Sequence, residues 1–126
     1  MGTVDTNVLV RLIIGDDAHQ TAAAGAFAQQ GVWVSIITLA DAVWTLKKSL
    51  KFRPAELATA IEMLLHHKYI TLQDSDAVAA ALDLFRSRPA LGFYDCLILE
   101  LARKAGHLPL ATFDRALGKI EGTHKL

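Results

Sequence analysis

Residues 32–50 read VWVSIITLADAVWTLKKSL, and this stretch decides the fold class. Its first part, residues 32–35, has the length and the apolar character of a buried β-strand. Its second part, residues 38–50, repeats apolar side chains at the spacing of one helical face. The repeat consists of Leu39, Val43, Leu46 and Leu50. A strand that leads directly into a helix is the building unit of α/β proteins, so we expect an α/β fold.

The same alternation extends in both directions along the chain. Strands separated by helices indicate a parallel sheet covered on both faces, which is an α/β sandwich. Pro109 indicates that its strand begins there or lies at an edge, because proline has no amide hydrogen to donate to a ladder. The other predicted strands are residues 3–6, 69–72, 108–112 and 123–126, and the other predicted helices are residues 17–29, 54–66, 75–86 and 93–104.

The composition fits one compact domain over residues 1–126. The chain has 126 residues, of which 52% are hydrophobic, and it contains no repeat or linker-like stretch. The apolar run near its beginning is interrupted by Arg11 and is far shorter than the roughly 20 residues that a membrane span needs. No basic segment precedes that run, so it does not resemble a secretory signal. We therefore expect no membrane association and a cytoplasmic location.

Charge and cysteine content restrict the possible chemistry. The single cysteine, Cys96, has no second thiol with which to form a disulfide or a zinc knuckle, so any metal would be held by oxygen atoms. Thirteen basic and thirteen acidic residues cancel, so the overall field does not attract nucleic acid. The densest basic stretch, Lys47 to Arg53, can contact nucleic acid locally or can be a solvated helix end.

Two aspartates follow predicted strands. Asp5 ends the first strand and Asp114 follows the fourth, and in open parallel sheets active sites form at the carboxyl edge where strands end. Each of them alone can equally be a turn residue or a helix cap.

Two more aspartates lie in predicted helices. Asp41 stands among apolar and small neighbours, so we expect its carboxylate to be partly buried, either at an acidic site or paired with a basic side chain. Asp95 lies in the first turn of its helix, where the helix dipole alone would favour a negative charge.

The four aspartates together predict a metal site. Two carboxylates about 4 Å apart repel by roughly 4 kcal/mol at an effective dielectric near 20, and only a proton or a cation relieves that repulsion. An all-carboxylate set suits Mg²⁺ or Mn²⁺ better than zinc. Such an ion can activate water for attack on a phosphodiester and can neutralise the charge that develops on the phosphate oxygens.

Four motifs in this order resemble those of PIN-domain ribonucleases, and of VapC-type toxins from toxin–antitoxin pairs in particular. They are Val4-Asp5-Thr6-Asn7-Val8-Leu9-Val10, Leu39-Ala40-Asp41-Ala42-Val43-Trp44, Phe93-Tyr94-Asp95-Cys96-Leu97-Ile98 and Thr112-Phe113-Asp114. The resemblance implies a three-layer α/β/α sandwich with a five-stranded parallel sheet. It also implies Mg²⁺- or Mn²⁺-dependent cleavage of RNA, a homodimer and inhibition by a small antitoxin.

By position, the resemblance assigns Asp5, Asp41, Asp95 and Asp114 as the catalytic and metal-binding residues. Asn7 and Thr112 would be polar supports that orient carboxylates or water, although Asn7 can be a turn residue and Thr112 a strand residue.

Two positions depart from the family pattern. Asp41 stands where the family usually has glutamate, and Gly92 stands where many relatives carry an acid. The alternative is therefore a catalytically weak or inactive PIN-like module that binds RNA or protein.

The aromatic neighbours of these acids have two interpretations. Phe93, Tyr94 and Phe113 can stack on unpaired RNA bases, or at least Phe93 and Phe113 belong to the core. Phosphatases with an aspartate nucleophile also place that aspartate after the first strand, but they need a second acid two residues later, where this chain has Asn7.

Overall fold

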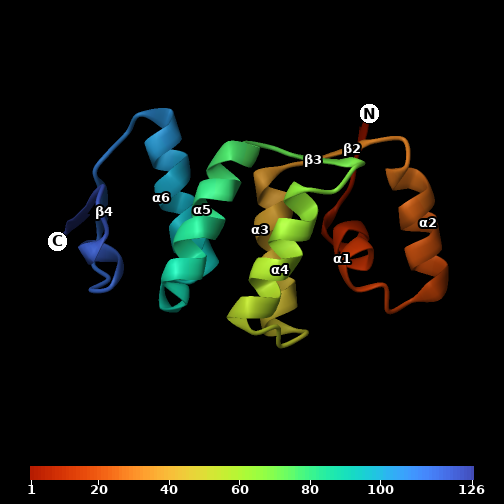
Figure 1. Ribbon diagram of the computed structural model, residues 1–126, viewed down its shortest axis with the longest axis horizontal. Helices are drawn as coiled ribbons and strands as arrows, with labels where there is room; N and C mark the ends of the chain where they lie inside the picture. The colour runs from red at the N-terminus through yellow and green to blue at the C-terminus, as the bar shows by residue number, and fades with distance from the viewer. The chain divides into compact units, whose positions relative to one another are not determined.

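The computed structural model describes residues 1–126, and the chain divides into two compact units (Figure 1). The first unit comprises Met1–Ser75 and the second Asp76–Leu126. None of the helices is both long and apolar enough to cross a membrane.

The first unit contains a three-stranded parallel sheet and four helices. The strands lie in the order β1-β2-β3, with Gly2 opposite Val32 and Val32 opposite Ile70. Helix α1 packs against both α2 and α3, and α4 packs against β3. The elements are β1 (Gly2–Thr3), α1 (Thr6–Ile14), α2 (Ala18–Ala28), β2 (Val32–Val34), α3 (Ile36–Lys48), α4 (Pro54–Leu65) and β3 (Ile70–Leu72).

The second unit holds two helices, two short 3-10 turns and a pair of parallel strands. Its core includes Phe85 and Phe93, whose rings meet edge to face with centroids 5.9 Å apart. The elements are α5 (Ser75–Ser87), η1 (Pro89–Leu91), α6 (Phe93–Ala105), β4 (Leu110–Thr112), η2 (Leu117–Lys119) and β5 (Thr123–Lys125).

The predicted α/β class is confirmed. Five parallel strands occur at the five predicted places, three of them hydrogen bonded in the first unit and two in the second. The strand after Pro109 begins one residue later, at Leu110. All five predicted helices are present, each within about two residues of its expected bounds. The basic residues Lys47 and Lys48 are exposed in the last turn of α3, as both interpretations of this stretch require.

One helix was not predicted. The strand expected over residues 3–6 ends at Thr3, and the chain turns at Asp5 into α1. Asp5 is the N-cap of this helix, with extended backbone angles, and its Oδ1 accepts the amide hydrogen of Val8 at 3.0 Å. The helix ends at Gly15, whose φ of 62° lies in the left-handed region that glycine tolerates.

This cap gives a prediction for stability. We expect Asp5→Ala to lower the free energy of unfolding by about 1 kcal/mol, because the amide of Val8 loses its acceptor. Asp5→Asn keeps an acceptor oxygen and should unfold close to the wild type. Urea denaturation followed by circular dichroism measures both. Equal losses for the two variants would mean that the charge, and not the cap, stabilises α1.

Candidate acidic metal centre

In the first unit, Asp5 and Asp41 lie near the N-terminal end of α1. Thr6, the residue after Asp5, is the first residue of that helix. Its hydroxyl donates a hydrogen bond of 2.6 Å to Oδ2 of Asp41 on α3. This bond joins the start of α1 to α3, so the two carboxylates lie in the same region of the unit, and both are exposed.

The expected burial of Asp41 is wrong. The buried side of α3 is formed by other residues, while Asp41 shares the opposite side with Ile37 and Trp44, whose exposed fractions are 80% and 47%. The helix is apolar on both sides, so apolar neighbours in the sequence did not indicate burial. The partner of Asp41 is the hydroxyl of Thr6 rather than a basic side chain. The buried side consists of Leu39, Ala42, Val43 and Leu46.

In the second unit, Asp95 and Asp114 interact electrostatically. The pKa of Asp95 is raised above its usual value, first because partial burial removes water from the carboxylate and second because Asp114 is negatively charged. Asp95 lies in the first turn of α6 and makes no hydrogen bond through its side chain. It is therefore a partly desolvated carboxylate beside a like charge, an arrangement that a cation would relieve.

Asp114 is held in a defined turn after β4. Its Oδ2 accepts the amide hydrogen of Leu117 at 2.7 Å, and its own amide donates to Oγ1 of Thr112 at 3.0 Å. The capping role considered for Asp5 and Asp114 is thus present in both. Each cap uses one carboxylate oxygen, so the second oxygen of each side chain carries no hydrogen bond.

The two supporting residues differ in their contacts. The hydroxyl of Thr112 accepts the amide hydrogen of Asp114, so it contacts this residue at the backbone and not at the carboxylate. Asn7 is exposed in the first turn of α1 and makes no hydrogen bond to an aspartate. Thr6 was not singled out from the sequence. The signal that could have found it is its position directly after a capping aspartate, which puts a threonine in the first helical turn.

Neither unit by itself gathers three or more side chains of His, Cys, Asp or Glu that could hold a metal ion. Each unit supplies two of the four aspartates. Cys96 is fully buried, and burial raises the pKa of its thiol to about 11, so it offers no thiolate ligand.

The aromatic residues near Asp95 and Asp114 are not alike. Phe93 is buried, as one interpretation expected, but Phe113 is 81% exposed, so its assignment to the core is wrong. The residue where relatives often carry an acid, Gly92, has φ 79° and ψ 146°. Residues other than glycine rarely adopt that backbone conformation, so an aspartate or glutamate at this position would be strained.

A family model for the PIN domain matches residues 3–122, which is nearly the whole chain. The chain belongs to the PIN domain family. PIN domains are generally nuclease domains, and they generally use divalent metal ions. Comparisons with curated proteins and with solved structures give no match. The matched region includes all four candidate ligands, Asp5, Asp41, Asp95 and Asp114.

The interaction between the two acids of the second unit gives a second prediction. We expect Asp114→Asn to lower the pKa of Asp95, because the variant removes the like charge. The value should stay above the usual one, since burial is the larger cause. Carboxyl chemical shifts measured by NMR through an acid titration report it. Asp83→Asn, on the exposed side of α5, is the matched control.

The raised pKa of Asp95 determines how the ionisation of this residue changes the stability of the fold. A carboxyl whose pKa is raised by folding binds its proton more tightly in the folded state, so its ionisation costs stability as the pH rises through that pKa. An unchanged pKa of Asp95 in Asp114→Asn would mean that the two carboxylates do not interact.

Proposed function

We propose that this PIN domain is a metal-dependent endoribonuclease whose four aspartates, Asp5, Asp41, Asp95 and Asp114, form one acidic centre. The observation that carries the proposal is the repulsion between Asp95 and Asp114, two carboxylates close enough for one to raise the pKa of the other in a chain of a nuclease family. Two of the four residues come from each unit, and the family model covers all four.

The available donors fit a hard cation. Asp5 and Asp114 each keep one oxygen free of hydrogen bonds, and Asp95 keeps both. All candidate ligands are carboxylate oxygens, which Mg²⁺ and Mn²⁺ prefer, and the only thiol is buried and protonated. When bound, such an ion supplies an activated water and neutralises phosphate charge.

The other residues would position these ligands. The hydroxyl of Thr6 holds Oδ2 of Asp41 and leaves Oδ1 free to face a ligand. The hydroxyl of Thr112 fixes the backbone at Asp114, and with it the direction of that side chain. Asn7, exposed on the first turn of α1, would contact a water or a phosphate near Asp5. Asp95, whose raised pKa reflects partial burial and the charge of Asp114, would be stabilised as a carboxylate by a bound cation.

The biological role that we propose is that of the toxin in a toxin–antitoxin pair. The chain would act in the cytoplasm as a homodimer, cleave RNA and be inhibited by a small antitoxin protein. The support for these points is the resemblance of the four motifs to VapC-type toxins, together with membership of the PIN family.

The second candidate function is a catalytically weak or inactive PIN-like module that binds RNA or protein. The observation that favours it is the short and partly occupied side chain of Asp41. This residue is one methylene shorter than the glutamate usual in the family, and one of its oxygens already accepts a hydrogen bond from Thr6.

The activity itself is tested with purified protein and mixed single-stranded and structured RNAs. We expect cleavage with Mg²⁺ or Mn²⁺ and none with chelator. Asp5→Asn should lose cleavage while its unfolding curve stays close to the wild type, because the amide side chain still caps α1 but no longer offers a charged ligand.

Two results would contradict the proposal. Cleavage that survives both chelator and Asp5→Asn would place the activity elsewhere, in another site or in a contaminant. Metal-dependent binding of RNA without any cleavage would favour the second candidate.

Thr6 gives a prediction for a positioning residue. We expect Thr6→Val to weaken Mg²⁺ binding by roughly tenfold to a hundredfold, the usual effect of losing a group that orients a metal ligand. Thr6→Ser keeps the hydroxyl and should restore affinity. Isothermal titration with Mg²⁺ measures both, and urea unfolding checks that neither variant loses the fold. Equal affinities for Thr6→Val and Thr6→Ser would rule out this role.

A further inference from the structure

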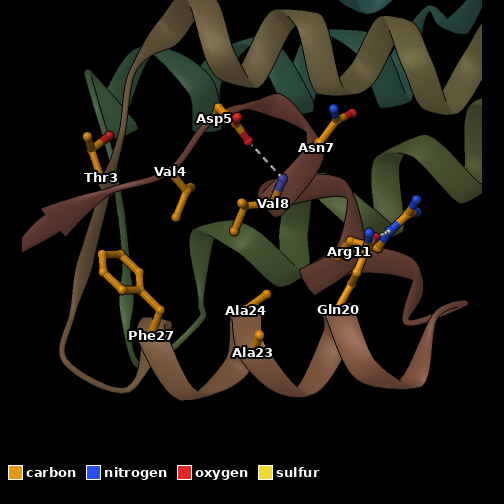
Figure 2. A pocket seen from close by; sticks show the side chains of 10 residues that line it. All are labelled: Thr3, Val4, Asp5, Asn7, Val8, Arg11, Gln20, Ala23, Ala24 and Phe27. Carbon is orange, nitrogen blue, oxygen red and sulfur yellow. Dashed lines mark hydrogen bonds between the residues drawn. The ribbon is translucent and has the colours of Figure 1, made fainter.

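A hollow of about 550 Å³ lies between α1, α2 and β1 in the first unit (Figure 2). Val4 and Val8 line it from one side, and Ala24 and Phe27 line it from α2. Asp5 also lines it, so the hollow adjoins one ligand of the proposed metal centre. Its volume lies within the roughly 300–1,000 Å³ range of sites that bind small molecules.

The sequence of α2 keeps this hollow open. On the side that lines it, this helix carries Ala23 and Ala24, whose side chains are too short to fill the space. One turn further, Phe27 lies against β1 at Gly2, where a Cβ atom would come within 2.7 Å of the ring. The glycine therefore lets the ring lie close to the strand. Phe27 is nevertheless 43% exposed, so part of its surface remains available to a ligand.

Polar groups lie farther along α1 from Asp5. The guanidinium of Arg11 donates from Nε to Oε1 of Gln20 at 2.6 Å and from Nη1 to Asp16 at 2.8 Å. Because Oε1 of Gln20 is occupied, its amide NH₂ is oriented and remains a donor. Arg11 and Gln20 both line the hollow. The hollow thus combines apolar walls and part of an aromatic ring with hydrogen-bond donors, beside a guanidinium that is paired with Asp16.

We propose that this hollow binds one unpaired nucleobase of the RNA substrate, next to the bond that is cut. The inference rests on the proposed nuclease function. Proteins recognise single-stranded RNA by stacking splayed bases on aromatic rings and by hydrogen bonding to the base edges. Phe27 supplies the ring, Gln20 supplies an edge donor, and Arg11, which is paired with Asp16, orients that donor. The position of Asp5 at the same hollow sets the adjoining phosphate beside the metal centre.

The variant that tests this inference is Ala23→Leu, which extends a side chain into the hollow from an exposed helical position. Leucine is a strong helix former, so α2 should be retained. The matched control is Ala22→Leu, which makes the same change at an exposed neighbour that does not line the hollow. Phe27→Leu is the second variant, since it removes the ring and keeps an apolar side chain.

The probes are the four nucleoside 5′-monophosphates and, as a control without a base, ribose 5-phosphate, all used without divalent metal. NMR amide shifts of the wild type should move around the hollow with at least one monophosphate and not with ribose 5-phosphate. Ala23→Leu and Phe27→Leu should each weaken that binding at least about fivefold, the lower range for one stacked base, while Ala22→Leu binds as the wild type does. The base preferred in binding should also be the base preferred beside the cleavage site.

The outcomes separate this inference from the proposed function. Equal responses to ribose 5-phosphate and to the monophosphates would overturn it, because only phosphate would then be recognised. A change of oligomeric state in Ala23→Leu with unchanged nucleotide binding would also overturn it, since the hollow would then be a protein interface. If the wild type cleaves RNA and these tests fail, the base site alone is wrong. If no RNA is cleaved but base binding behaves as described, the hollow is a nucleotide site and the nuclease proposal is wrong.

Discussion

The hydrogen bond from the amide of Val8 to Oδ1 of Asp5 sets where β1 ends and where α1 begins. Everything proposed for the first unit depends on that boundary. It makes Thr6 the first helical residue, in reach of Asp41 on α3, and it places α1 against α2 with the hollow between them. The same carboxylate keeps its second oxygen free, so a structural and a chemical role do not compete for one atom.

Capping alone does not explain why these residues carry charge. Asparagine and serine cap helices about as well as aspartate does, without introducing a negative charge. At Asp5 and at Asp114 the cap would therefore be satisfied by a neutral residue. At Asp95 the charge even works against folding, since burial and Asp114 both raise its pKa. The positive end of a helix dipole favours a negative charge at Asp5 and at Asp95, but it does not account for the like charges of Asp95 and Asp114 beside each other, which a cation would relieve.

The sequence predicted the strands and five of the helices because each has a clear apolar period and a boundary residue. The prediction missed α1 because the β-branched and apolar residues after Asp5 fit a strand as well as a helix. Asp5, which caps this helix, also fits the end of the preceding strand. Residues 8–10 are Val-Leu-Val, of which Leu9 and Val10 are buried inside the first unit, and this apolar run obscured the polar side of the helix, where Asn7 and Arg11 stand one turn apart.

Exposure was the property that the sequence predicted least well. Asp41 lies among apolar neighbours and is exposed, because α3 has an apolar residue on each side and only one side is buried. Phe113 is exposed for a different reason, since it stands between the end of β4 and the turn fixed by Asp114. Hydrophobic periodicity identified the buried side of α3 correctly through Leu39, Val43 and Leu46, and Asp41 lies off that side. Whether any other side chain is covered depends on which neighbouring elements pack against it.

The backbone explains one of the two departures from the family pattern, Gly92, and does not explain the other, Asp41. The acid missing at position 92 is a consequence of the chain path, because η1 gives way to α6 through a residue with φ 79° that only glycine adopts without strain. The backbone thus accounts for the glycine, and a metal centre would have to form from the four aspartates without a carboxylate at position 92. Asp41 has no such backbone cause, since it lies within regular helix. The choice between an active nuclease and an inactive module consequently depends on Asp41 and on the hydroxyl of Thr6 that orients it.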